Sequence, residues 1–231
     1  MITGEQLRVA RKDKRWTQVK AADRLGVSQT YLSLLENGDR PIPAALAQKA
    51  VSLFSLPLSA LPVTANVYGA HRETDQDELA EELAALGYPG YSYLQSHKKR
   101  NPAEVLVKAL SAENLDSRLI EALPWVVLKY PDLDWDWLLP VVKVHDLQNR
   151  LGFITSIARK LAEFEGKTKA ALLAQREAAI ERARMAREDT LCHESLSQAE
   201  RQWLREHRTA EARHWNLLTD LAPQHLSYAK G

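Results

Sequence analysis

The sequence predicts an all-α protein. Apolar residues recur at helical spacing along most of the 231 residues, and 45% of the residues are hydrophobic, enough to bury a core. The chain has nine glycines and lacks long alternating runs of β-branched residues, so strands have little support. We therefore expect a small N-terminal helical domain at residues 1–60, a linker at 61–75, a larger domain of stacked helical hairpins at 76–165, and C-terminal helices at 166–231.

Four short helices are predicted in the first 56 residues from local start and stop signals. Thr17 and Ser28 have hydroxyls that can cap free backbone N–H groups. Gly26 and Gly38 tolerate the left-handed backbone at a helix end, and Pro43 suits a first turn. Helices this short are marginal alone in water, so we expect them to pack as one unit of four to five helices. The expected helices cover 4–14, 17–26, 28–38 and 43–54.

The larger region is predicted to form helical hairpins without a fixed repeat period. Pro124 and Pro140 are expected to kink or split two of these helices. In the stretch "YPDLDWDWLLP" we expect Asp134 to cap a helix and one tryptophan to enter the core, in preference to a carboxylate metal site or an aromatic docking patch. The expected helices cover 77–86, 101–110, 116–129, 134–163 and 167–188, and a last one is opened by the capping box Ser197-x-x-Glu200.

Charge is distributed unevenly along the chain. Residues 1–56 contain nine Lys and Arg against five Asp and Glu, whereas the remainder contains 22 against 25. This predicts an anionic partner for the first segment only. The single cysteine, Cys192, excludes an internal disulfide and a multi-cysteine zinc site. No apolar run approaches the roughly 20 residues of a membrane span, so we expect a cytoplasmic protein without membrane contact.

Residues 17–38, "TQVKAADRLGVSQTYLSLLENG", predict a helix, a short turn and a second helix. The second helix begins with amides and hydroxyls of modest length, which are the groups that reach base edges when a helix enters the major groove of B-DNA. Its start also presents free N–H groups and a positive dipole end toward phosphate. Ser28 taken alone is better explained as a helix cap, but the complete motif favours sequence-specific DNA binding.

This segment resembles the phage-repressor-type helix-turn-helix proteins, also called the Cro/cI or xenobiotic-response-element family. The resemblance covers about residues 5–56 without a gap, and it is carried by Leu7-Arg8, Arg11, Thr17-Gln18, Gly26-Val27-Ser28, Leu35-Glu36-Asn37-Gly38 and Arg40. It implies base-facing roles for Gln29, Thr30 and Ser33, and contacts to the DNA backbone from Gln18, Ser28, Tyr31, Asn37 and Arg40.

The sequence departs from the family pattern at two positions. Ala21 stands where the family usually has a leucine, and Lys20 stands where an acidic residue often completes a capping box with Thr17. Trp16, which is unusually large at its position, is expected to fill the space that Ala21 leaves. These changes affect local packing and leave the expected docking mode intact.

Two other groups of residues could carry chemistry. His145, Asp146 and Arg150 would offer a base, a carboxylate and a cation within two helical turns, with Asn149 between them. We favour a structural interpretation, in which Asp146 and Arg150 form an i,i+4 ion pair on a solvated face and Gly152 allows close helix packing.

Cys192 and His193 could be a nucleophile or a ligand pair. Adjacent residues on a helix point about 100° apart, and nothing nearby in the sequence completes such a site. We therefore expect no enzyme activity, no catalytic residue, no metal and no cofactor.

The expected function is transcriptional repression by a homodimer on double-stranded operator DNA. One recognition helix covers only a few base pairs, so two half-sites about 34 Å apart improve affinity. The helix at 167–188 could pair with its mate or pack within the monomer. The final segment, with Trp203, Trp215 and several leucines, has no obvious framework to bury them and suggests a surface for a protein partner.

The region at 101–163 is weakly similar to antitoxin-like partners of bacterial toxin or phage-defence operons. We therefore predict an autoregulating antitoxin that binds a toxin through residues 75–231. The alternatives are a ligand-responsive or mobile-element regulator, and a protein-interaction scaffold that binds no DNA.

Overall fold

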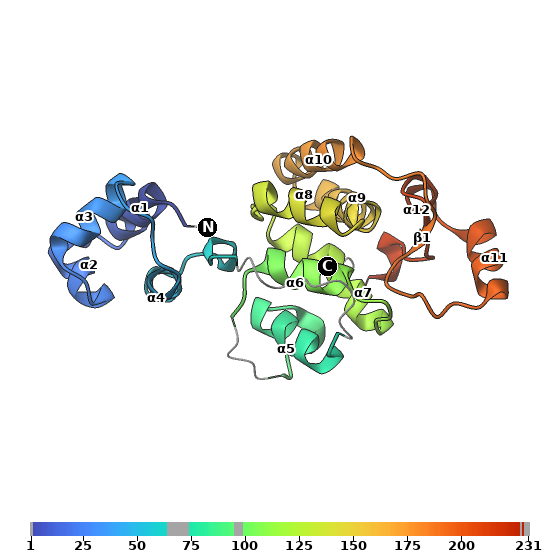
Figure 1. Cartoon of the computed structure of the whole chain (residues 1–231), viewed down its shortest axis with the longest axis horizontal. Helices are drawn as coiled ribbons and strands as arrows, with labels where there is room; N and C mark the ends of the chain where they lie inside the picture. Colours follow the sequence, from blue (N-terminus) through green and yellow to red (C-terminus); the bar gives the residue numbers. More distant parts are fainter. Residues whose placement is uncertain (1, 64–73, 95–98, 227, 229–231) are drawn as a thin grey trace. The chain divides into compact units, whose positions relative to one another are not determined.

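The computed structural model divides into two compact units, residues 1–65 and 66–231. Its described residues form twelve α-helices and only two short strands, so the all-α fold is confirmed (Figure 1). None of the helices in this described part is both long enough and apolar enough to cross a membrane. The structure describes residues 2–63, 74–94, 99–226 and 228.

The first unit consists of four α-helices and a short 3-10 turn. Thr17 and Ser28 accept hydrogen bonds from N–H groups in the first turns of the second and third helices, at 3.2 and 3.1 Å. Gly26 and Gly38 end these helices with left-handed φ angles of 74° and 80°. The elements are α1 (Gly4–Asp13), α2 (Gln18–Leu25), α3 (Gln29–Asn37), α4 (Ala44–Phe54) and η1 (Leu58–Ala60).

The core of the first unit is formed by one face of each helix, and α3 packs against both α1 and α2. Trp16 packs on this core from the α1–α2 turn, with its ring 5.7 Å from that of Phe54. Lys20 and Arg24 lie over the face of the same tryptophan at 5.3 and 5.9 Å. The fully buried core residues include Leu7, Ala21, Leu32, Leu35, Ala47 and Ala50.

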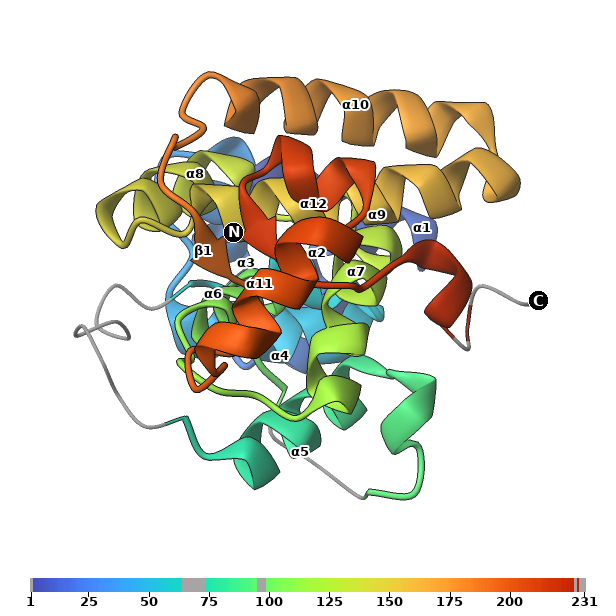
Figure 2. The same cartoon turned by 90° about the vertical axis from the view of Figure 1, so that its right-hand side faces the viewer.

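The second unit is organised around one long helix. This helix, α9, packs against α7, α8, α10 and α12, and α10 runs alongside it (Figures 1 and 2). The predicted hairpin domain and the predicted C-terminal helices therefore lie in one compact unit. Its elements are α5 (Gln76–Leu86), η2 (Pro89–Tyr91), α6 (Pro102–Leu110), α7 (Ser117–Lys129), α8 (Trp135–Val144), α9 (Gln148–Glu165), α10 (Lys167–Glu181), β1 (Asp189–Thr190), α11 (Gln198–His207), α12 (Ala210–His214), β2 (Leu217–Leu218) and η3 (Pro223–His225).

The C-terminal segment folds back onto α9. β1 pairs in parallel with β2, Asp189 opposite Leu217. Trp215 is fully buried, and a Cβ added to Gly152 would lie 2.3 Å from its ring, so Gly152 allows the close approach of a tryptophan ring, where the sequence predicts close packing of a helix. The segment therefore buries one of the two tryptophans for which the sequence shows no obvious common framework. Trp203 on α11, in contrast, is 51% exposed.

The prolines do not split their helices. Pro124 and Pro140 lie inside α7 and α8, where the surrounding helix persists despite one missing N–H donor. The segment predicted at 134–163 breaks instead between α8 and α9, where Asp146 has a φ of 57°. Asp134 caps α8 by accepting from the N–H of Trp137 at 3.2 Å, as predicted, and Trp135 is the tryptophan that enters the core.

Candidate nucleic-acid interface

A buried ion pair connects α1 with α3. Arg11 Nε and Nη2 donate to the two carboxylate oxygens of Glu36 at 2.6 and 2.9 Å. Arg11 Nη1 donates to the carbonyl oxygen of Trp16 at 2.9 Å. Bidentate contacts of this kind are among the strongest hydrogen bonds in proteins. The pair therefore fixes the position of α3 against α1 and the α1–α2 turn.

Both members of the pair are charged at neutral pH. Burial raises the pKa of the Glu36 carboxyl. Hydrogen bonds from Arg11 and Gln18 and the charges of Arg11 and Arg8 lower this pKa by more than burial raises it, so it lies below the ordinary 4.5. The hydrogen bond to Glu36 raises the pKa of Arg11, against the opposing effect of burial. A charged pair with these hydrogen bonds satisfies the condition under which buried charges are tolerated.

From this ion pair, hydrogen bonds continue through two glutamines to the start of α3. Gln18 Nε2 donates to Glu36 Oε2 at 3.0 Å, and Gln29 Nε2 donates to Gln18 Oε1 at 2.9 Å. Gln18 is the first residue of α2, and Gln29 is the first residue of α3. We term Arg11, Glu36, Gln18 and Gln29 the polar chain. It connects the buried ion pair directly to the residue predicted to read a base.

The other residues predicted to face bases lie on the side of α3 away from the core. Thr30 is exposed and Ser33 is half-buried. Leu34, one turn beyond Thr30, is also half-buried on this side of the helix. Amides and hydroxyls alone do not identify it, whereas its i,i+4 spacing from Thr30 does.

The residues predicted to contact the DNA backbone lie on or near α3. Ser28 is exposed and caps the helix, and Tyr31 is half-buried against the core. At the other end, the exposed Asn37 accepts a hydrogen bond from Arg8 Nη2 through its Oδ1. Arg40 is exposed in the connection to α4. Their roles toward DNA, like those of the base-facing residues, stay predictions.

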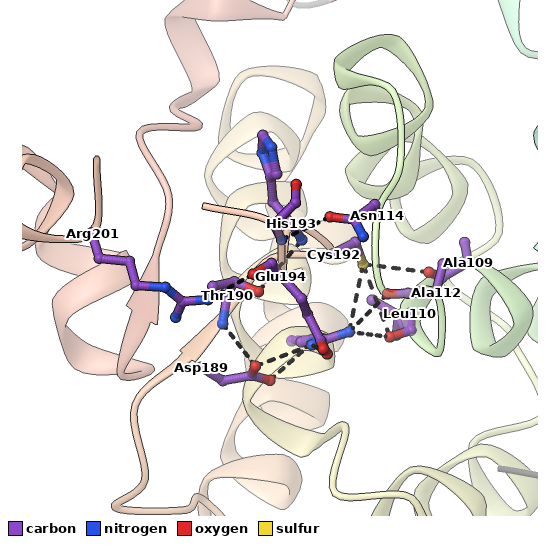
Figure 3. A network of polar contacts seen from close by, with 12 residues as sticks. Ala109, Leu110, Ala112, Asn114, Asp189, Thr190, Cys192, His193, Glu194 and Arg201 are labelled. Atoms are coloured by element: carbon purple, nitrogen blue, oxygen red, sulfur yellow. Dashed lines mark hydrogen bonds and ion pairs between the residues drawn. The ribbon is translucent and has the colours of Figure 1, made fainter. Parts of the chain in front are cut away.

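A second buried arginine lies on α9. Arg150 Nε and Nη2 donate to the carboxylate of Asp189 at 2.9 and 3.0 Å, and Nη2 also reaches Glu194 at 3.3 Å. Nη1 donates to the carbonyl oxygens of Leu110 and Ala112 at 2.8 and 3.1 Å. We term Arg150, Asp189 and Glu194 the Arg150 cluster, and Figure 3 shows how Asp189 and Glu194 converge with the 109–112 backbone. Its contacts join α6, α9 and the segment after α10.

The predicted ion pair between Asp146 and Arg150 is therefore wrong. Asp146 is exposed and precedes α9, so the two residues do not share a helix face. Asn149 is also engaged elsewhere, since its amide donates to the carbonyl oxygen of Met185 at 2.9 Å and accepts from its N–H at 2.8 Å. Asn149 and Arg150 therefore bind the segment that follows α10 and do not form an open site with Asp146.

The Cys192 thiol is fully buried beside the Arg150 cluster (Figure 3). Its Sγ donates to the carbonyl oxygen of Ala109 at 3.3 Å, and burial raises its pKa to about 11. A thiol with such a pKa is a poor nucleophile and metal ligand, because the thiolate is the reactive form. Across the described residues, no three or more His, Cys, Asp or Glu side chains are grouped so that they could hold a metal ion.

Comparison with known proteins assigns the first unit. A family model described as Helix-turn-helix matches residues 7–61, which include most of α1, all of α2 to α4 and the whole polar chain. No curated protein matches the chain, and no solved structure does. Residues 7–61 are therefore a helix-turn-helix domain of the phage-repressor type, and the protein is a DNA-binding transcription regulator.

Proposed function

We propose that the protein is a sequence-specific repressor that binds operator DNA as a homodimer, with α3 in the major groove. The observation that carries this proposal is the polar chain. It orients the amides of Gln18 and Gln29 before DNA arrives, which reduces the conformational entropy lost on binding. Gln18 would then donate to a phosphate while Gln29 faces the bases.

The orientation of Gln29 suggests which base it reads. One N–H of its amide is used by Gln18, so the carbonyl oxygen and the second N–H remain available. A glutamine amide presents one acceptor and one donor to the N6 amino group and N7 of adenine in the major groove. We therefore propose an adenine opposite Gln29 in each half-site, with Thr30 and Ser33 facing neighbouring bases.

The test uses an operator selected by the wild-type protein from randomised duplexes. Gln29→Ala is expected to cost roughly 1–3 kcal/mol on this operator and to relax the preference at one base position. Gln48→Ala, which truncates an exposed glutamine on α4, is the matched control and should bind as wild type does. Wild-type affinity for the operator by Gln29→Ala would contradict the assignment of base-reading residues.

Arg40→Ala separates backbone contact from base reading. It should weaken binding to all duplexes alike and reduce the salt slope by about one. A protein-interaction scaffold would bind no duplex at any salt concentration, whereas a repressor should show affinity that falls steeply as salt increases.

We further propose that the second unit binds a protein partner, so that the chain acts as an autoregulating antitoxin and not as an enzyme. Two observations support a non-catalytic second unit: Asn149 and Arg150 bind protein backbone and carboxylates, and Cys192 is buried. The test is co-expression with the product of the adjacent gene. Relief of that product's toxicity, together with repression of a reporter placed behind the protein's own promoter, is the expected result.

A further inference from the structure

The turn between α1 and α2 contains an arginine in a backbone conformation that favours glycine. Arg15 has a φ of 55°. Its N–H donates to the carbonyl oxygen of Lys12 at 2.7 Å, and the N–H of Trp16 donates to that of Arg11 at 3.1 Å. This is the hydrogen-bond pattern of a Schellman motif, in which the left-handed position is usually glycine because a Cβ destabilises it. The ends of α2 and α3 do have glycine there.

Contacts within the first unit do not explain why an arginine occupies this left-handed position. Arg15 is exposed, and its guanidinium has no hydrogen-bond or ion-pair partner among the residues that the structure describes. Lys12 and Lys14 are exposed and equally unpartnered within that part of the chain. Cations interact favourably with the C-terminal end of a helix dipole. Lys12 and Lys14 already provide that interaction for α1, and it does not require an arginine in the left-handed position.

The position of the turn relative to the polar chain points to DNA. Arg15 precedes Gln18, the residue expected to contact phosphate, by three residues. The same turn is fixed by Arg11, which donates to the carbonyl oxygen of Trp16 while it binds Glu36. The turn is therefore attached to the ion pair that positions α3. Arg15 therefore lies in the turn that leads into α2, whose free N–H groups also favour phosphate.

We propose that Arg15 is an additional contact to the DNA backbone and binds a phosphate beside the one that Gln18 contacts. The unfavourable backbone conformation of Arg15 is retained because the guanidinium increases affinity for DNA. The inference rests on the proposed docking of α3, and it extends the contact surface to the α1–α2 turn. It also predicts opposite effects of one substitution on stability and on binding.

The experiment replaces Arg15 by glycine in the full-length chain and measures two quantities. Arg15→Gly is expected to raise Tm by a few degrees, because glycine removes the cost of the left-handed conformation. It should also lower affinity for a short mixed-sequence duplex several-fold and reduce the slope of log K against log salt by about 0.9. Arg15→Lys, which keeps the charge, should retain the wild-type slope.

The matched control is Ser55→Gly. Ser55 ends α4 with a φ of 57° and is exposed, so glycine there relieves the same conformational cost. This variant should raise Tm without changing affinity or salt slope. Wild-type affinity and slope in Arg15→Gly would overturn the inference, as would a fall in Tm together with the loss of affinity, since Arg15 would then act through the fold.

The outcome also separates this inference from the proposed function. If Arg40→Ala reduces the salt slope and Arg15→Gly does not, the additional contact is wrong and DNA binding through α3 stands. If the wild-type protein binds no duplex even at low salt, both fail.

Discussion

The two units each contain a buried arginine paired with carboxylate, but the two arginines are connected to different surroundings. Arg11 binds Glu36, and from Glu36 hydrogen bonds continue through Gln18 and Gln29 to the protein surface. Arg150 binds two carboxylates and two backbone carbonyls, all from its own unit. The first arrangement ends at an exposed amide on the predicted DNA-binding helix, whereas the second ends at backbone carbonyls and at two carboxylates, of which Glu194 is exposed.

The comparison shows that burial of a charge does not by itself identify a functional site. The two cases differ in whether hydrogen bonds continue from the carboxylate through further side chains to a predicted DNA-contacting residue, as they do from Glu36 through Gln18 to Gln29. A substitution in the polar chain should lower both stability and DNA affinity. A substitution in the Arg150 cluster should chiefly lower the stability of the second unit. Four measurements test this distinction.

The largest effect is expected for Arg150→Ala. It removes the guanidinium that donates to Asp189 and to the carbonyls of Leu110 and Ala112, and removal of one partner from a buried pair costs about 3–5 kcal/mol. Urea unfolding monitored by circular dichroism measures the loss. Arg118→Ala, at an exposed arginine on α7, is the matched control and should change stability by less than about 0.5 kcal/mol. Equal stability of the two variants would refute a structural role for the Arg150 cluster.

A smaller loss of stability is expected for Glu36→Gln. The substitution keeps the shape of the side chain but leaves the Arg11 guanidinium buried without a counter-charge, which costs about 1–3 kcal/mol. Because Gln18 also loses a charged acceptor, operator affinity should fall with stability. Glu5→Gln, at an exposed carboxylate of α1, should change neither. Loss of stability without loss of operator affinity would show that the ion pair does not orient Gln18 and Gln29 for DNA binding.

The hydrogen bond between Gln18 and Gln29 can be measured with a double-mutant cycle in operator binding. If each amide orients the other, Gln18→Ala and Gln29→Ala should be non-additive, with a coupling of about 0.5–1.5 kcal/mol. Additive losses would mean that the two glutamines contact DNA independently. The pair Gln29→Ala and Gln48→Ala provides the additive reference.

The smallest expected effect is the contribution of Glu36 to the pH dependence of stability. The pKa of Glu36 is lower in the folded protein than its ordinary 4.5, so the unfolded chain binds more protons in acid. The stability that this carboxylate contributes is complete above about pH 4.5 and is lost as pH falls through the folded pKa. Unfolding midpoints measured across this range should fall less steeply for Glu36→Gln than for the wild type. Identical slopes would show that Glu36 is not the titrating group.

The sequence predicts the first unit well because its signals are local. Thr17, Ser28, Gly26 and Gly38 each cap a helix within a few residues, and the observed helices follow them. The family resemblance placed Gln18 and Gln29 among the site residues. Their hydrogen bond to each other and the link to Glu36 were not predicted, because they depend on how α1, α2 and α3 pack.

The second unit was predicted less well because its decisive contacts join distant residues. Arg150 was assigned to Asp146, four residues away, whereas its partners lie 39 and 44 residues later. The burial of Trp215 cannot be predicted from the sequence, because its ring packs against Gly152, a residue without a side chain that lies 63 positions earlier. Asp134 and the Ser197–Glu200 capping box were identified, since both signals act within one turn.

The packing of Trp215 on Gly152 also has a consequence for synthesis of the chain on the ribosome. The first unit contains all of its described helices within residues 1–65. In the second unit, the face of α9 at Gly152 stays uncovered until Trp215 and β2 have emerged, and Tyr228 Oη donates to the carbonyl oxygen of Glu121 only after that, at 2.8 Å. Domains generally fold as they leave the ribosome. The DNA-binding unit can therefore be complete while the buried face of α9 still awaits translation of the last residues that cover it.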